Sequence, residues 1–179
     1  MLNFARSKTV NSQPENILHN QSPFKSNFFA NLLRDGYHLR VQVTGKSMMP
    51  FIKSGSFVTL SRTPVANLCI GDIVLCQCND GSLMLHRLIR KKGDMLLTKG
   101  DALFALDAPF HLSAYKGRAI RVELTDPHVI CSQDMDKLFM RFHNFLIAKY
   151  FYFKLALINI YRRLRLLKTR LASPPLRFF

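Results

Sequence analysis

The chain has 179 residues, 48% of them hydrophobic, which suits one domain with a core of its own. Its formal net charge of +15 at pH 7 excludes a charge-balanced surface and indicates an anionic partner. There is no run of about 18 uncharged apolar residues and no apolar signal-peptide core near the start, so we expect neither a spanning helix nor a signal peptide.

The first part of the chain divides into a polar arm and a short helix. Residues 1–21 are polar and irregular, which predicts a flexible arm. Ser22 and Pro23 form an N-cap followed by proline at the first helical position, and Gly36 marks the stop. Between these signals apolar side chains recur at helical spacing, at Phe24, Phe28, Phe29, Leu32 and Leu33. We therefore predict an amphipathic helix over residues 23–35.

From Tyr37 to Leu124 the sequence favours β-strands. Turn signals separate the strand-like runs, and Asn-Asp-Gly at residues 79–81 is the strongest hairpin signal. The runs cover residues 38–44, 56–61, 72–78, 82–90, 95–98 and 117–124, with an irregular loop at 101–114. Short strands at roughly ten-residue spacing predict a mainly β fold with a small rolled or barrel-like antiparallel sheet. We assign this domain to residues 22–124.

The C-terminal part has a different composition. All 11 acidic residues lie at or before Asp136, whereas Lys and Arg continue to the end of the chain. An apolar stripe at helical spacing predicts a long basic amphipathic helix that opens at Ser132 or Asp136, in a tail over residues 132–172. A basic block within it is the candidate site for an anionic partner, and it consists of Arg162, Arg163, Arg165, Lys168 and Arg170.

Three arrangements of this tail remain open from sequence. The helix packs its apolar stripe on the domain, or it lies on an anionic lipid surface, or it spans a membrane around residues 145–161. Aromatic residues beside Lys and Arg suit the lipid surface. Lys149 and Lys154 oppose a spanning segment, because each costs roughly 2.5–3.5 kcal/mol near the centre of a bilayer.

The stretch that bears most on function is Thr-Gly-Lys-Ser-Met-Met-Pro at residues 44–50, directly after a strand-like run. A serine hydroxyl becomes an effective nucleophile when a base lies within hydrogen-bond reach and backbone N–H groups face the developing oxyanion. Gly45 permits a sharp turn and the close approach of a peptide backbone. By itself, the stretch also fits a strand end followed by a turn with a solvated serine.

Downstream residues complete a relay of nucleophile, base and orienting acid. His86 lies within a strand-like run and shares a face with Met84 and Leu88. Asp101 and Asp107 follow in the loop after the next strand. A single histidine in a strand is usually a core or edge residue, and a loop aspartate usually caps a turn, so the interpretation rests on the combination.

Four boxes in order resemble the signal peptidase and LexA-like serine peptidase superfamily, on its signal peptidase I side. Gly-Lys-Ser-Met-Met-Pro at residues 45–50 is similar to the nucleophile box, and Leu-Cys-Ile-Gly-Asp-Ile-Val at 68–74 resembles the strand opener. His-Arg-Leu-Ile at 86–89 occupies the general-base box. Lys-Gly-Asp at 99–101, with Asp107 six residues on, resembles the box that ends the catalytic core.

The resemblance covers about half of the chain and implies a mechanism. Ser47 would attack the scissile carbonyl, His86 would act as the base, and Asp107 would orient it, with Asp101 as the second candidate. A histidine in this box is similar to the endoplasmic-reticulum, archaeal and sporulation-type branch, whereas bacterial signal peptidases and LexA-like proteins typically have lysine. Lys99 is the nearest alternative base.

The same resemblance implies where the oxyanion is held. The backbone N–H groups of Ser47 and Met48 would donate to it. Gly45 stands where many signal peptidases have a serine donor, so the hole relies on the backbone. The N-terminal membrane anchor usual in those enzymes is not expected here.

We therefore predict a serine endopeptidase that cleaves a leader or precursor peptide. The alternatives are a self-cleaving LexA-like regulator and an inactive peptide-binding or membrane-associated module of the same fold. No cofactor or metal is expected, and nucleic acid is not an expected partner because no DNA- or RNA-binding signature accompanies the charge. Four cysteines without Cys-x-x-Cys spacing suit a reducing compartment, so we expect a cytoplasmic protein, with the inner membrane face as a peripheral site.

Overall fold

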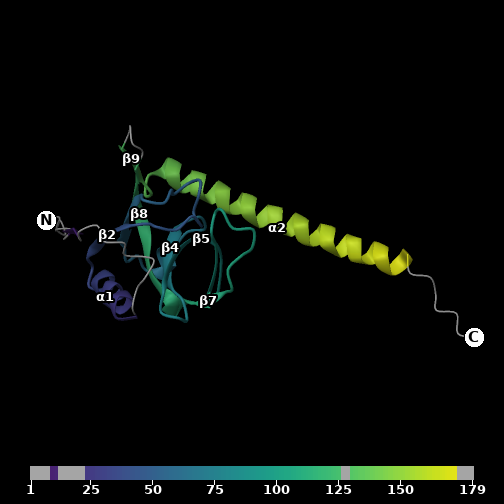
Figure 1. Cartoon of the computed structure of the whole chain (residues 1–179), viewed down its shortest axis with the longest axis horizontal. Helices are drawn as coiled ribbons and strands as arrows, with labels where there is room; N and C mark the ends of the chain where they lie inside the picture. The colour runs from purple at the N-terminus through teal and green to yellow at the C-terminus, as the bar shows by residue number, and fades with distance from the viewer. Residues whose placement is uncertain (1–8, 12–22, 126–129, 173–179) are drawn as a thin grey trace, which may run out of the picture.

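The computed structural model describes residues 9–11, 23–125 and 130–172, which form two helices and nine strands (Figure 1). The elements run in the order β1 (Thr9–Asn11), α1 (Pro23–Arg34), β2 (His38–Gln42), β3 (Phe57–Ser61), β4 (Ile73–Gln77), β5 (Leu83–Lys92), β6 (Met95–Lys99), β7 (Phe110–His111), β8 (Tyr115–Thr125), β9 (Ile130–Asp134) and α2 (Leu138–Ala172). Two short 3-10 turns lie at Val65–Asn67 and Leu112–Ala114.

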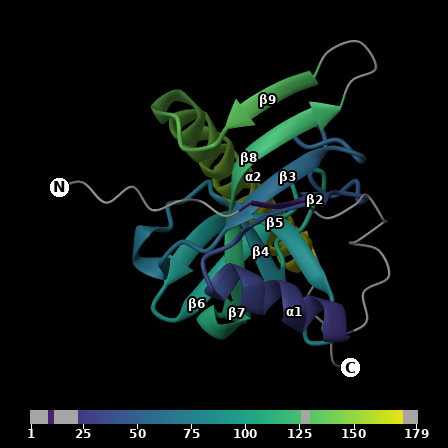
Figure 2. The same ribbon diagram turned by 90° about the vertical axis from the view of Figure 1, so that its left-hand side faces the viewer.

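The strands form one coiled sheet with the order β1-β2-β3-β8-β4-β5-β6-β7, and β9 pairs with β8 outside this path (Figure 2). Every pairing is antiparallel except that of β1 with β2. β3 and β8 lie side by side although they are far apart in sequence, which rolls the sheet into a half-barrel. The prediction of a mainly β fold with a rolled antiparallel sheet, a short first helix and a long last helix is confirmed.

β4 runs between the two hydrophobic cores of the domain. Because side chains alternate across a strand, Ile73 and Leu75 enter the larger core while Val74 and Cys76 enter the smaller one. α1 closes the larger core with Leu33, which is fully buried. The predicted stop of α1 is also confirmed, since Gly36 takes φ +88° and its N–H donates to the Leu33 carbonyl.

Four elements differ from the sequence prediction. Thr9–Asn11, within the predicted arm, form the edge strand β1, and the rest of that arm lies outside the described residues. Phe110–His111, within the predicted loop, pair with β6 as β7. Residues 132–134 belong to β9, and α2 begins at Leu138. Ser132 and Asp136, the two predicted starts of this helix, were therefore both too early.

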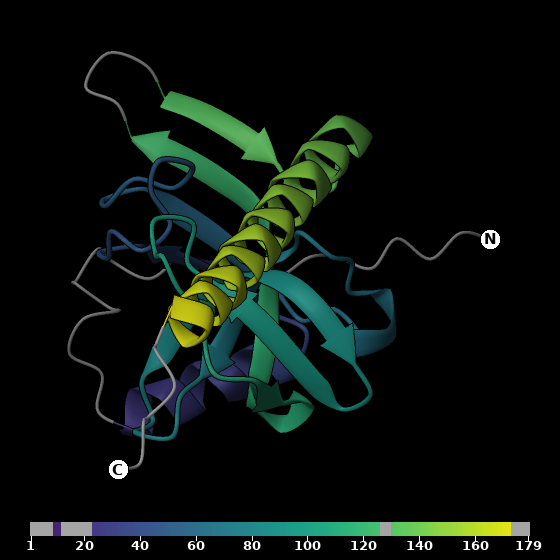
Figure 3. The ribbon, with the colours of Figure 1, turned by 90° about the vertical axis from the view of Figure 1, so that its right-hand side faces the viewer.

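α2 has 35 residues, which corresponds to a length of about 50 Å. Its first half crosses the sheet against β5, and its second half extends away from the β domain (Figure 1). Figure 3 shows the helix lying diagonally over the strands. Within the described ranges, no helix has the length and hydropathy to cross a bilayer.

Candidate active site

Ser47 lies in a tight turn between β2 and β3. The Met49 N–H donates to the Lys46 carbonyl over 3.1 Å, which makes Ser47 and Met48 the central residues of the turn. The side chains of Met48 and Ile52 are almost fully buried in the larger core and anchor the turn from below. The serine is thus presented at a fixed position and remains half-buried.

The backbone around Ser47 leaves donors available. In the part of the chain that the structure describes, neither the Ser47 N–H nor the Met48 N–H has a hydrogen-bond partner. A side chain at Gly45 would meet no atom within 4 Å, so the surface beside the turn is open. Two free N–H groups next to a serine are the parts that an oxyanion hole needs.

His86 and Asp107 form a close pair. His86 lies in β5 opposite Val74, and its side chain is only 7% exposed. Its Nδ1 is 2.7 Å from Asp107 Oδ2. Because an ionised carboxylate only accepts hydrogen bonds, Nδ1 carries the proton and Nε2 is left as the basic nitrogen.

Thr98 holds the acid of this pair in place. Its hydroxyl donates to Asp107 Oδ2 over 2.6 Å, and its carbonyl accepts the Asp107 N–H over 3.0 Å. Burial works to raise the pKa of Asp107, but the hydrogen bonds from His86 and Thr98 outweigh it and leave that pKa below its ordinary value. Asp107 is therefore ionised at neutral pH, as an orienting acid must be.

Asp101 takes a different partner. Both of its carboxylate oxygens accept from the Arg87 guanidinium, at 2.8 and 2.7 Å, and both side chains have no exposed surface. Arg87 also donates to the Gly71 carbonyl and to Asn144 Oδ1 of α2. Of the two predicted acids, Asp107 reaches His86, whereas Asp101 ties its loop to β5 and α2.

The loop of Asp101 also touches the serine turn. The Ala102 N–H donates to the Ser47 carbonyl over 2.8 Å, and a Cβ at Gly100 would lie 2.9 Å from that oxygen. Arg87 pairs with Lys99 across β5 and β6, and Gly100 directly follows Lys99. The loop that contacts the turn of Ser47 therefore starts where β6 ends beside the strand of His86. Among the described residues no hydrogen bond joins Ser47 Oγ to His86, a contact that commonly tightens only with substrate.

Lys99, the alternative base, is engaged elsewhere. Its ammonium lies 3.8 Å from the centre of the Phe151 ring and donates to the Gly100 carbonyl. Burial lowers the pKa of Lys99, partly offset by the nearby Asp101 carboxylate. Its contacts join β6 to α2 and give it no link to Ser47.

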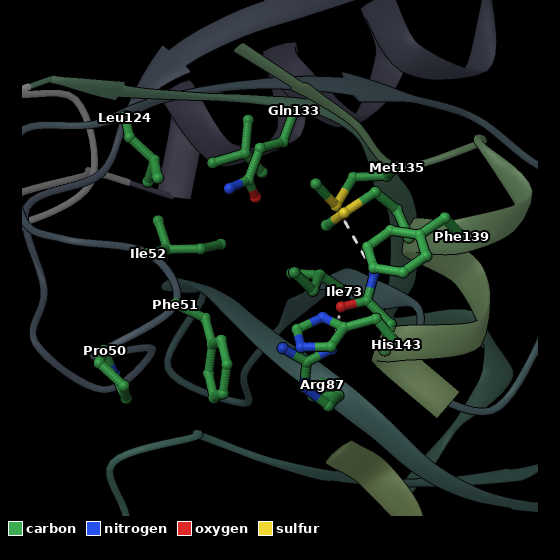
Figure 4. Close-up of a pocket in the computed structure, with 13 residues that line it drawn as sticks. Pro50, Phe51, Ile52, Ile73, Arg87, Leu124, Gln133, Met135, Phe139 and His143 are labelled. Carbon is green, nitrogen blue, oxygen red and sulfur yellow. Dashed lines mark hydrogen bonds between the residues drawn. The ribbon is translucent and has the colours of Figure 1, made fainter. Parts of the chain in front are cut away.

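α2 forms one wall of the region beyond the serine. A cavity of about 370 Å³ lies between the turn at residues 50–52, strands β8 and β9, and the start of α2. Figure 4 shows the residues that line it. The His143 ring stands between Phe51, at 6.0 Å edge to face, and Phe139, at 6.4 Å stacked. Its Nδ1 is buried and has no hydrogen-bond partner among the described residues. The cavity is mainly apolar, and Pro50, the first of its lining residues in the sequence, comes three residues after Ser47.

The basic block lies apart from the serine. Arg162, Arg163 and Arg165 are exposed in the second half of α2. Lys168 and Arg170 fall within the helix, but their side chains lie outside the described part of the structure. Arg162 lines a pocket together with Lys99 and Asp101, so this end of the basic block borders the loop that follows β6.

Several residues of the site were missed from sequence. Arg87, Thr98 and Asn144 make the contacts that fix the two acids, yet their partners are up to 57 residues away. The one available signal was Arg87, a charged residue inside an apolar strand run, which requires a buried counter-charge.

A family described as Peptidase S24-like matches residues 7–101, just over half of the chain. The match includes Ser47, His86 and Asp101, and it ends before Asp107 and α2. No curated protein matches the chain. The turn with its serine, the half-barrel that carries it and the family match agree, and the chain belongs to the Peptidase S24-like family.

Proposed function

We propose that this protein is a serine endopeptidase that resembles signal peptidase I and cleaves a leader or precursor peptide. The observation that carries the proposal is the His86–Asp107 contact of 2.7 Å, with Asp107 in the same loop as Ala102, whose N–H donates to the Ser47 carbonyl. A serine with a histidine base and an orienting carboxylate is the arrangement used for acyl transfer.

The proposed reaction has two halves. Ser47 Oγ attacks the scissile carbonyl carbon while its proton passes to His86 Nε2, and the carbonyl oxygen becomes an oxyanion. Collapse of this intermediate breaks the C–N bond, and His86 returns the proton to the leaving amine. Water then repeats the sequence on the acyl-enzyme, with His86 accepting its proton, and releases the carboxylate product and free Ser47.

Each of these groups contributes to the rate of the proposed reaction in its own way. Asp107 keeps Nδ1 of His86 protonated and stabilises the imidazolium that forms during attack. The Ser47 and Met48 N–H groups donate to the oxyanion, and a donor of this kind contributes about 2.7–4 kcal/mol. Proton transfer through a positioned histidine contributes about 10²- to 10⁴-fold.

Purified protein and a library of peptides with small residues before the cleavage site test this proposal. We expect cleavage by the wild type and its loss, by at least about 10³-fold, in Ser47→Ala and His86→Ala. Ser54→Ala is the matched control, because Ser54 is exposed in the next turn and donates only to the Thr44 carbonyl. Equal cleavage by wild type and Ser47→Ala would contradict the proposal.

The same incubation distinguishes the proposed endopeptidase from the second candidate function, a self-cleaving LexA-like regulator. A self-cleaving regulator converts itself into two fragments without added peptide, and Ser47→Ala stays intact. The endopeptidase proposed here leaves its own chain intact and cleaves the added peptide. Mass spectrometry of the intact protein before and after incubation distinguishes the two.

A further inference from the structure

α2 carries a long apolar surface that the β domain leaves uncovered. Met140, Asn144 and Ala148 lie on one side of the helix at four-residue spacing, and this side is turned to the domain. Other large apolar side chains of α2 are exposed, and they are Leu138, Phe139, Phe142, Phe145, Leu146, Tyr150, Tyr152, Phe153, Leu157, Ile158, Ile160, Tyr161 and Leu164. Exposure on this scale marks an interaction surface.

Five of these exposed residues follow one stripe. Phe142, Phe153, Leu157, Ile160 and Leu164 fall within about 60° of one another on a helix of 3.6 residues per turn, opposite the domain-facing side. Phe142 is 59% exposed, Phe153 67% and Leu164 55%. The stripe runs for about 33 Å and continues where α2 extends beyond the sheet (Figure 1).

Positive charge borders the stripe along its length. Residues 138–172 contain no Asp or Glu, and Lys and Arg occur throughout them. Lys149 lies at the edge of the stripe, and Arg163 and Arg165 flank its outer end on either side; all three are exposed. Arg162 lies on the opposite side of the helix, where it lines a pocket with the loop at residues 101–106. An apolar face bordered by Lys and Arg matches a surface that is apolar beneath and anionic at its boundary.

A second copy of the chain would match this surface poorly. Two such helices would set Lys149 and the arginines against the same residues of the partner, with no acidic side chain between 138 and 172 to neutralise them. Lys149 and Lys154 also interrupt the most apolar part of the helix, which suits a helix lying in the interface, where lysines reach the headgroups.

We propose that α2 lies on a lipid bilayer with anionic headgroups, its Phe142–Leu164 stripe inserted among the acyl chains. The basic residues contact the headgroups, and the β domain, which packs on the opposite side of α2, stays in water. Membrane binding and peptide cleavage use different residues, so Ser47→Ala retains the first and loses the second.

Vesicle co-sedimentation of the full chain tests this. At physiological salt we expect binding to vesicles of two parts phosphatidylcholine and one part phosphatidylserine, and little binding to phosphatidylcholine alone. Replacing Lys149, Arg163 and Arg165 with Gln weakens binding on the order of 100-fold. The matched control replaces Arg90, Lys92 and Arg121, exposed cations of the β domain, and retains most of it.

Fluorescence locates the inserted face. The chain has no Trp, so Phe153→Trp places the only indole on the stripe, and Phe28→Trp places it on α1, where Phe28 is 54% exposed. We expect the emission of Phe153→Trp to shift to shorter wavelength with anionic vesicles, while that of Phe28→Trp stays unchanged. Circular dichroism confirms that both variants are folded.

Three results would overturn the inference. One is absence of binding to anionic vesicles by folded wild type. Another is equal loss of binding in the variant with Lys149, Arg163 and Arg165 replaced and in its β-domain control. The third is concentration-dependent dimerisation in sedimentation equilibrium that Phe153→Ser abolishes, without vesicle binding, which would assign the stripe to a second copy.

Discussion

Asp107 is the residue on which the proposed chemistry depends most closely, because its carboxylate fixes the proton on His86. Asp107→Asn keeps the size of the side chain but removes the charge and permits the wrong histidine tautomer. We expect kcat to fall by about 10³- to 10⁴-fold while the protein stays folded. Steady-state kinetics with the cleaved peptide measures this, and an unchanged kcat would show that another group orients His86.

The pKa of Asp107 also makes a prediction about stability. Its folded-state pKa lies below the ordinary value of 3.8, so between these two values the unfolded chain binds more protons than the folded chain. The stabilisation from ionised Asp107 is therefore complete above about pH 4 and is lost as the pH falls through the folded-state pKa. Urea unfolding should show wild type losing more stability than Asp107→Asn on acidification. Parallel losses would contradict the lowered pKa.

Substitution of Gly45 distinguishes an effect on stability from an effect on peptide cleavage. Nothing in the structure lies within 4 Å of a Cβ at this position, and its φ is not positive, so Gly45→Ala should leave stability unchanged or raise it by about 0.4–1 kcal/mol. In the proposed reaction the peptide backbone passes this open surface, and kcat/KM should fall at least tenfold. A variant with wild-type kcat/KM would place the substrate elsewhere.

At the level of single residues, sequence proposed Ser47, His86 and both acids, with Asp107 as the first candidate partner of His86, and the structure shows Asp107 in contact with His86 and Asp101 in contact with Arg87. Asp101 and Asp107 are six residues apart in one loop, and only the path of that loop decides which reaches His86. The loop is held by Thr98 and Arg87, whose contacts arise in the folded chain.

Arg87 connects four elements. From β5 it binds Asp101 in the loop after β6, Asn144 in α2 and the Gly71 carbonyl, and its guanidinium lies 5.5 Å from the Phe51 ring. A buried pair of this kind holds elements in register, and its loss on one side leaves an uncompensated charge.

This arrangement predicts that substitutions of Arg87 and Asp101 have non-additive effects on the free energy of unfolding. Arg87→Met should lower the free energy of unfolding by about 3–5 kcal/mol, because Asp101 stays buried without its partner. The double variant with Asp101→Leu should recover much of that loss. Denaturant unfolding of the single and double variants measures the coupling. Additive losses would show that the pair does not hold the elements together.

The elements that sequence predicted correctly share one property, a local signal. Alternating apolar residues and Gly-containing turns located β2 to β6 and β8, and Pro23 and Gly36 bounded α1. The strands that were missed, β1, β7 and β9, are short and exist through their pairing with β2, β6 and β8. The start of α2 was misplaced for the same reason, because β9 occupies residues 130–134.

At the scale of the whole molecule, α2 connects the candidate active site to the proposed membrane surface. Its domain-facing side supplies Asn144 to Arg87 and Phe151 to Lys99, and its outward side is the proposed membrane surface. The sequence left three arrangements for this helix. The structure shows it packed on β5 along its first half with apolar residues exposed throughout its length, a combination that periodicity alone does not distinguish.

The central claim is that Ser47 is activated by His86, and covalent labelling tests it without knowledge of the substrate. An alkyl fluorophosphonate reacts with serines whose hydroxyl is activated by a base, and the mass of the intact protein reports the adduct. We predict one adduct, mapped by peptide sequencing to Ser47, in wild type and in Ser54→Ala, and none in Ser47→Ala or His86→Ala. An unlabelled wild-type Ser47, or labelling that persists in His86→Ala, would contradict the account.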